Sequence, residues 1–327
     1  MKRRDFIALF GTVVIAPGMA IAQTPGRVYR VALVSAGGVV PETALYAKLL
    51  LGGLAKLGYT PGQNLAFEGP HGAAGQPVQL PHLMEELKAA KVDAIVVFGY
   101  PTAVAAKAAG LPTVVAFGVG DPVATGLVVN LARPEGNITG ISDVATTLST
   151  KRLSLLKELL PKLHRVAMLW NKDDLGMSLR YEASAKVAQS IGVTVQALGV
   201  REPDDFNDAF AVMNDDTPDA ILMVADALTN LNRERVFEFA VARKLPAIYE
   251  YDFLVRDGGL MSYGPDVTES FERAAALVDS IFKGAKPGEL PFEQPTRYPF
   301  VLNLKTAGSM GLEIPPTLLA LADEVIE

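Results

Sequence analysis

Short apolar runs alternate with longer amphipathic segments along almost the whole chain, and this alternation limits the possible folds more than any other feature. The runs are rich in Val, Ile and Phe, as is typical of buried β-strands. The segments between them have the spacing of helices, and strands joined by helices form a parallel sheet. The expected strands are residues 29–35, 65–68, 93–98, 113–117, 165–170, 194–198, 220–224 and 247–249, and the expected helices are residues 43–57, 81–90, 151–160, 178–191, 206–214, 232–244 and 268–282.

The same pattern occurs twice. The run RVALV at residues 30–34 returns as RVAML at residues 165–169, and Leu111-Pro112 returns as Leu245-Pro246. A repeat of this kind indicates two similar units, and a 327-residue chain exceeds what one hydrophobic core usually organises. The sequence therefore predicts an α/β protein of two similar, doubly wound parallel-sheet lobes. We expect lobe I to comprise residues 28–140 and about 265–297, and lobe II to comprise residues 141–264 and about 298–327.

The first 22 residues have the features of an export signal. A positive segment, Lys2 to Arg4, precedes the apolar stretch Phe6 to Ile15, and Ala20 to Ala22 form a small-residue cleavage site. Because the apolar stretch is too short to span a bilayer, we expect cleavage after Ala22 and release into the periplasm. The adjacent arginines suit a twin-arginine signal, and the Sec route stays open. The chain has no cysteine, so neither lipid attachment nor a disulfide is expected.

Several functions are excluded by composition and motif spacing. The net charge of −6 disfavours binding to nucleic acid or to anionic lipid. His71, His82 and His164 lack metal-binding spacing, so we expect neither metal nor cofactor. Ser154 to Lys157 fit S-x-x-K inside an expected helix, and Gly118-x-Gly120 lacks the third glycine of a dinucleotide fingerprint. We therefore expect no enzymatic activity.

The expected ligand site lies where the carboxyl ends of the strands in the two lobes face each other. Ligands of open α/β sheets bind at this edge, and two facing lobes can close on a small solute by hinge motion. The residues expected to bind the ligand are Ser35, Tyr100, Thr102 and Asp121 from lobe I, and Trp170, Asn171, Asp226, Tyr249 and Glu250 from lobe II. The residues expected at the crossings between lobes, as hinges, are Asn137, Thr139, Ser262, Tyr263 and Gly264.

Some of these residues have alternative structural roles. Asp121 and Asp226 could cap a turn or a helix, and Trp170 could pack within its lobe. Side chains alternate along a strand, so at least one of Tyr249, Glu250 and the following Tyr251 should point into the lobe. From the sequence, both a ligand-binding role and a structural role stay open for these residues.

The carboxylates indicate the chemistry of the solute. Burying an unpaired carboxylate is costly, and no arginine lies in the loops that adjoin Asp121, Asp226 and Glu250. We therefore expect a solute with an amino group or several donors, an amino acid or a related nitrogenous compound, its apolar part covered by Tyr249 or Trp170. Its carboxylate would be held by backbone amides around Gly37, Gly38 and Gly120, or by Lys172.

Several ordered blocks carry a resemblance that covers almost the whole chain. They include VGDPV at residues 119–123, LARPEGNITG at residues 131–140, GGLMSYG at residues 258–264 and NLKTA at residues 303–307. The chain resembles the ABC transporter substrate-binding family that includes tryptophan-binding members. The resemblance implies a monomeric periplasmic receptor of the type I bilobal kind, which delivers its solute to a membrane permease driven by a separate ATPase.

The resemblance leaves two questions open. Glu135 stands where glycine is usual, near the expected crossing between lobes. Asn171-Lys172 stands on the rim of the expected cleft where Asn-Pro is usual, so ligand identity does not follow from the family. A periplasmic sensor built on the same fold, which passes its signal to a kinase, is the alternative.

Overall fold

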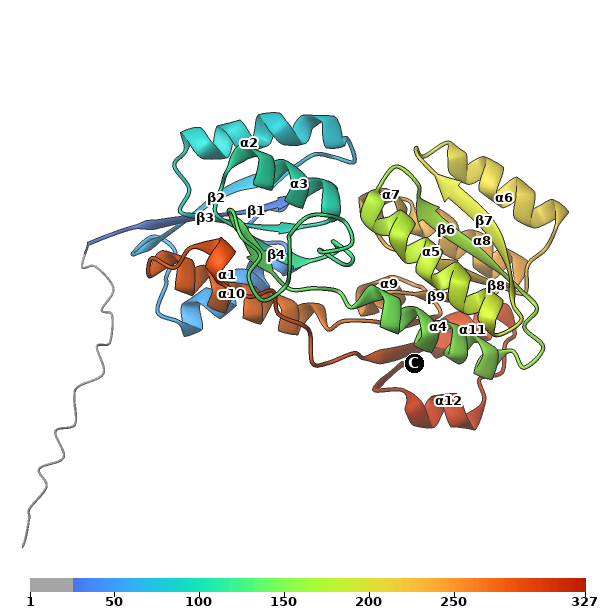
Figure 1. Cartoon of the computed structure of the whole chain (residues 1–327). Coiled ribbons are helices and arrows are strands. Elements are labelled where there is room, and N and C mark those ends of the chain that lie inside the picture. The colour runs from blue at the N-terminus through green and yellow to red at the C-terminus, as the bar shows by residue number, and fades with distance from the viewer. Residues whose placement is uncertain (1–25) are drawn as a thin grey trace, which may run out of the picture.

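The computed structural model describes residues 26–327, without the side chains of residues 145 and 146. It forms two α/β lobes that lie next to each other (Figure 1). The expected signal segment, residues 1–22, lies outside the described residues.

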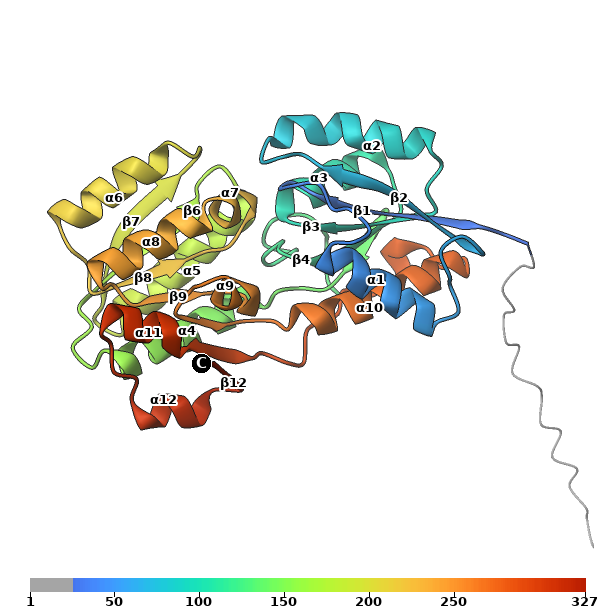
Figure 2. The same ribbon diagram turned by 180° about the vertical axis from the view of Figure 1, so that it is seen from behind.

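Lobe I contains a five-stranded parallel sheet in the order β2-β1-β3-β4-β5. Its central strands are buried along nearly their whole length, which explains their continuous apolar sequences. Helix α10 returns to this lobe late in the chain and packs along α1, as Figure 2 shows. The elements are β1 (Tyr29–Ser35), α1 (Leu45–Lys56), β2 (Leu65–Gly72), η1 (Pro77–Gln79), α2 (Leu80–Ala89), β3 (Ala94–Phe98), α3 (Tyr100–Ala109), β4 (Thr113–Phe117), β5 (Ile138–Gly140), α10 (Val267–Phe282) and η2 (Pro287–Glu289).

Lobe II contains a seven-stranded sheet in the order β12-β11-β10-β9-β8-β6-β7. All its pairings are parallel except that of β10 with β11. The elements are α4 (Ala145–Leu159), β6 (Arg165–Asn171), α5 (Leu175–Ser190), β7 (Thr194–Val200), α6 (Asp205–Asp215), β8 (Ala220–Met223), α7 (Ala227–Leu231), α8 (Arg233–Arg243), β9 (Ala247–Tyr249), α9 (Asp252–Arg256), β10 (Met261–Tyr263), β11 (Phe300–Asn303), α11 (Leu304–Met310), α12 (Pro316–Leu321) and β12 (Glu324–Ile326).

The chain passes between the lobes three times: from β5 to α4, from β10 to α10, and from the segment after α10 to β11. Asn137 and Thr139, expected at a crossing, lie at the edge of the lobe I sheet. The Asn137 side-chain amide donates to the Leu111 carbonyl at 2.7 Å, and the Thr139 hydroxyl donates to the Leu290 carbonyl at 2.8 Å. The Ile141 amide also donates to the Val115 carbonyl of β4 at 2.9 Å, and the Ser142 amide donates to the Glu293 carbonyl at 2.8 Å, so the first crossing begins after Ser142.

Ser262 and Tyr263 belong to β10, and Gly264 begins the second crossing. The Tyr263 carbonyl accepts a hydrogen bond from the Arg152 guanidinium at 2.7 Å. This bond fixes the start of the second crossing to helix α4.

Candidate functional site

A cavity of about 1000 Å³ lies between the two lobes. Its lobe I side is formed by loops that follow β1, β3 and β4, and its lobe II side by loops that follow β6, β8 and β9. These are the carboxyl ends of parallel strands, where an open α/β sheet binds its ligand. The volume is at the upper end of the range for small-molecule sites, about 300 to 1000 Å³.

One part of the cavity wall is aromatic. Tyr46, Phe98 and Phe117 come from lobe I, and Tyr251 and Phe253 come from lobe II. The ring centroids of Phe117 and Tyr251 are 5.3 Å apart, and those of Tyr46 and Phe253 are 6.3 Å apart, so rings of the two lobes meet here. Both pairs have an edge-to-face geometry, which is favourable for aromatic rings. This wall suits a flat apolar group.

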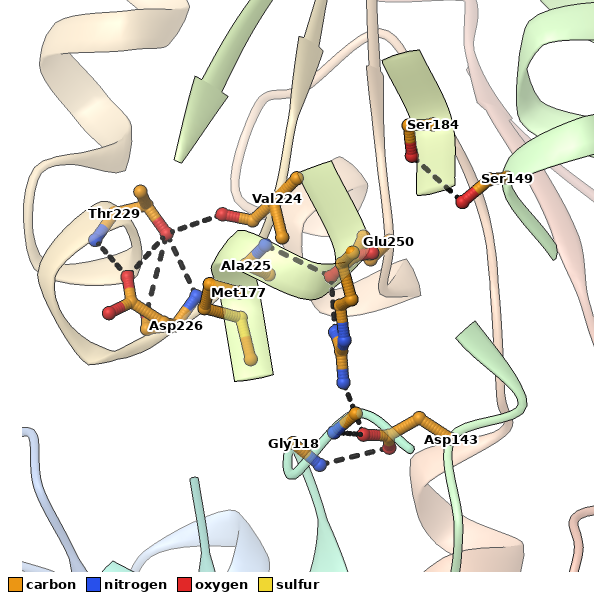
Figure 3. Close-up of polar contacts among 12 residues, drawn as sticks. Gly118, Asp143, Ser149, Met177, Ser184, Val224, Ala225, Asp226, Thr229 and Glu250 are labelled. Carbon is orange, nitrogen blue, oxygen red and sulfur yellow. Dashed lines mark hydrogen bonds and ion pairs between the residues drawn. The ribbon is translucent and has the colours of Figure 1, made fainter. Parts of the chain in front are cut away.

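Another part of the wall carries two buried carboxylates from lobe II. Asp226 is the N-cap of α7 and exchanges hydrogen bonds with Thr229 (Figure 3). Asp226 also accepts a hydrogen bond from the Asn171 side chain at 2.6 Å. Asp174 is the N-cap of α5 and accepts from the Met177 amide at 3.2 Å. Beside them, the buried Oδ1 of Asn230 has no hydrogen-bond partner.

Burial disfavours the ionised forms of Asp174 and Asp226. Burial, and then the charge of Asp226, raise the pKa of Asp174 to about 7. Burial also raises the pKa of Asp226, against the hydrogen bonds from Thr229 and Asn171. Within the described part of the chain, no lysine or arginine forms an ion pair with either carboxylate. A cationic donor from a ligand would complete this wall.

A buried charge network lies behind the cavity and consists of Asp143, Arg152, Arg180 and Glu250. Glu250 accepts hydrogen bonds from Arg152 at 2.8 Å and from Arg180 at 2.6 Å, and Arg180 also donates to Asp143. All four side chains are at most 3% exposed. Burial would raise the pKa of Glu250, but the two guanidinium groups lower it below its usual value. Two arginines and two carboxylates make the network neutral as a whole.

Four of the nine expected ligand residues line the cavity: Ser35, Tyr100, Asn171 and Asp226. The Ser35 hydroxyl accepts from the Gly37 amide at 2.9 Å, and the Tyr100 hydroxyl donates to the Thr125 carbonyl at 3.3 Å. The other five lie outside the lining. Of these, Thr102 is fully buried in the first turn of α3.

Trp170 and Tyr249 pack inside lobe II. The Trp170 ring stacks on Tyr181 of α5 at a centroid distance of 3.7 Å, and Tyr249 packs edge-on against Phe237. Neither ring lines the cavity. Tyr251, which lies beyond the end of β9, lines it instead of Tyr249.

Asp121 and Glu250 satisfy their charges within the protein. Asp121 caps its own turn and accepts from the amides of Val123 and Ala124. The expectation that Glu250 is an unpaired carboxylate is wrong, since Arg152 of α4 and Arg180 of α5 both donate hydrogen bonds to it.

The groups expected to hold a ligand carboxylate are only partly in place. Gly37 and Gly38 line the cavity, whereas Lys172 does not. The Gly120 amide is committed to Asp143 at 2.9 Å, so this amide is not free for a ligand. Arg233 lines the cavity and is paired with Asp257 at 2.8 Å.

Comparison with known proteins decides the family. The family model for ABC transporter substrate-binding proteins matches residues 39–326. The chain belongs to this family. It is a class of proteins that bind substrates rather than transform them. In residues 26–327, no helix is long and apolar enough to cross a membrane.

Three relatives illustrate the similarity. A tyrosine-binding protein of Clostridioides difficile (strain R20291) is 24% identical over 258 residues, which cover 78% of this chain and 73% of that protein. The structure of a conserved domain protein from Vibrio cholerae is 25% identical with a TM-score of 0.84, and covers 91% of this chain and all of that one. The structure of an ABC domain from Streptococcus pneumoniae in complex with L-Trp is 25% identical with a TM-score of 0.80, and covers 90% of this chain and all of that one.

The two-lobed α/β fold expected from the sequence is confirmed, and so is the resemblance to this family. The substrate-binding protein also contains cavity residues that sequence reasoning missed. Asp174 precedes a helix and has the N-cap signal that could have revealed it. Tyr46 lies inside α1 and Phe253 inside α9, where a search restricted to strand ends does not reach.

Proposed function

We propose that this substrate-binding protein captures an α-amino acid with an aromatic side chain and delivers it to an ABC permease driven by a separate ATPase. The observation that carries the proposal is the contrast between the two walls of the cavity. The ammonium group would pair with Asp226 and Asp174, and the ring would lie among Tyr46, Phe117 and Tyr251.

Physical chemistry supports this orientation of the ligand. A buried carboxylate without a cationic partner is unfavourable, so closing the cavity is favoured when the ligand brings a positive charge to Asp174 and Asp226. An aromatic ring gains apolar contact and edge-to-face geometry in the aromatic part of the wall. Relatives that are named for tyrosine binding and solved with L-Trp agree with a ligand of this class.

The remaining parts of the proposal concern transport. The lobes would close on the amino acid by a hinge motion at the three crossings. The receptor would act as a monomer in the periplasm after cleavage of the signal behind Ala22. The closed form would present both lobes to the permease.

L-Tyrosine and L-tryptophan are the first ligands to test on the mature protein by calorimetry and thermal shift. We expect either to raise the melting temperature, because a ligand that binds only the folded state stabilises it. N-Acetyl-L-tyrosine and 3-(4-hydroxyphenyl)propanoate lack the ammonium group and should bind at least about tenfold more weakly, since a charged hydrogen bond contributes roughly 1.5 to 3 kcal/mol.

The variant Asp226→Asn should show the same loss of affinity as removal of the ammonium group. Asparagine is also a good N-cap, so α7 should persist while the charge is lost. Asp121→Asn is the matched control, because Asp121 caps a turn outside the cavity. Equal affinity for L-tyrosine and its N-acetyl derivative would contradict the ammonium site.

Ligand affinity should fall as the pH drops below about 7, the pKa of Asp174 in this buried position. Below that pH Asp174 binds a proton, which must leave before the carboxylate can pair with an ammonium group. The decrease should approach about tenfold per pH unit. The charged neighbours of Asp174 are Asp226, the N-cap of α7, and Arg180 on α5. Burial, and then the charge of Asp174, raise the pKa of Tyr100 on α3. Asp174→Asn should give a flatter profile in calorimetry, and an unchanged profile would exclude Asp174 as the titrating group.

A further inference from the structure

Asp143 connects the two lobes through both of its carboxylate oxygens. It lies in the first crossing, between β5 and α4. Oδ1 accepts from the Gly118 amide at 2.9 Å, and Oδ2 accepts from the Gly120 amide at 2.9 Å. Both amides belong to the lobe I loop that follows β4. The Arg180 guanidinium of α5 in lobe II donates to the same Oδ2.

Arg180 is itself anchored to the lobe II sheet. Its other terminal nitrogen donates to Glu250, which follows β9 and also accepts from the Ala225 amide at 3.0 Å. Figure 3 draws this series of contacts from Ala225 and Glu250 to Asp143 and Gly118. A continuous path of charged hydrogen bonds therefore runs from one lobe to the other.

The lobes also touch beside this path. A Cβ atom built on Gly176, in the first turn of α5, would lie 3.0 Å from the Val119 carbonyl oxygen and 3.3 Å from the Tyr100 Cβ. A Cβ built on Gly120 would lie 3.2 Å from the Gly176 carbonyl oxygen. Backbones of the two lobes therefore approach closely at the point where Asp143 and Arg180 meet. If the lobes rotate apart, Asp143 cannot keep both its lobe I amides and Arg180.

We propose that Asp143 and Arg180 form an interlobe latch that positions the lobes for ligand binding and sets the balance between open and closed receptor. The contacts of the latch are formed in this structure, so the latch favours the arrangement of the lobes described here. Apparent affinity depends on the fraction of molecules in the binding-competent arrangement. Neither residue lines the cavity, so they act on the ligand only through the arrangement of the lobes.

The test measures the distance between the lobes directly. The chain has no cysteine, so two introduced cysteines can carry spin labels without competing sites. Glu85 on α2 is suitable, since its side chain is 66% exposed, and so is Val212 on α6, which is 44% exposed. Without ligand, pulsed electron paramagnetic resonance should show a longer distance between the two spin labels in Asp143→Asn than in the parent protein. Asp121→Asn, in the same lobe I loop, should leave the distance unchanged.

Asp143→Asn alone leaves an unbalanced positive charge in the buried network and could unfold the protein. A double variant that removes one charge of each sign avoids this. Asp143→Asn with Arg180→Gln removes the latch and leaves Arg152 paired with Glu250 in the core. In this variant we expect the longer distance and about tenfold weaker binding of L-tyrosine, with a saturating ligand restoring the short distance. Folded single and double variants with the parent distance would overturn the latch. The distance without ligand does not depend on which amino acid binds, so failure of the proposed ligand class would be separately visible.

Discussion

Replacement of Glu250 by glutamine should lower the free energy of unfolding by about 3 to 5 kcal/mol, although the two side chains have nearly the same size. Glu250 is 1% exposed and holds two guanidinium groups. The substitution turns a neutral buried network into one with an unbalanced positive charge. Desolvated charge without a partner is among the largest single causes of destabilisation.

Chemical denaturation measures this loss, and two comparisons separate charge from shape. Glu68→Gln removes the partner of Arg30 in a partly exposed ion pair and should cost at most about 1 kcal/mol. Glu250→Gln combined with Arg152→Met leaves Arg180 balanced by Asp143, so the double variant should lose less stability than the two single variants added together. Simple additivity would show that the network is not coupled.

The stabilising effect of Glu250 should also depend on pH. The folded protein lowers the pKa of Glu250 below its ordinary value of 4.5, so its ionised form stabilises the fold at neutral pH. As the pH falls below about 4.5, the unfolded chain takes up a proton first and this stabilisation is lost. The difference in stability between the parent protein and Glu250→Gln should therefore narrow in acid.

Strand positions were predictable because buried parallel strands leave uninterrupted apolar runs, such as TVVAF in β4. Helix α3 was missed, although Pro101 in its first turn and Gly110 at its end, with φ of +74°, are helix signals. Tyr100 and Thr102, expected at the carboxyl end of a strand, lie in the first turn of this helix. Helices α7 and α9 have five residues each, too few to show a helical period.

Ligands of open α/β sheets bind at the carboxyl ends of the strands, and this rule predicted which edge of the sheets holds the cavity. It also located Ser35, Asn171 and Asp226, which line the cavity. The same rule could not show which charges are neutralised. Arg152 and Arg180 meet Glu250 from helices that lie 98 and 70 residues earlier in the chain. Only the packing of α4 and α5 against the sheet brings them together, and local sequence does not encode that contact. Glu250 was therefore assigned to the ligand, although its role is structural.

The other large loss of stability is expected for Gly264→Ala, at the start of the second crossing. A Cβ atom on Gly264 would lie 1.7 Å from the Glu250 carbonyl oxygen and 2.9 Å from the Glu250 carbonyl carbon. Both neighbours are backbone, so no side-chain rotation relieves the overlap. The chain must move either the crossing or the end of β9, and either movement disturbs the hydrogen bonds of Arg152 with Tyr263 and Glu250. We expect a loss on the order of 4 to 5 kcal/mol or failure to fold.

Gly308→Ala is the matched control for this substitution. Gly308 lies in α11, and a Cβ atom there would meet nothing within 4 Å. Alanine in a helix interior is favoured over glycine by roughly 0.5 to 1 kcal/mol, so this variant should be slightly more stable than the parent. Thermal melts followed by circular dichroism compare the two directly. An equal melting temperature for Gly264→Ala and the parent protein would mean that the second crossing can shift away from Glu250. The hydrogen bond from Arg152 to Tyr263 would then not fix the crossing to lobe II.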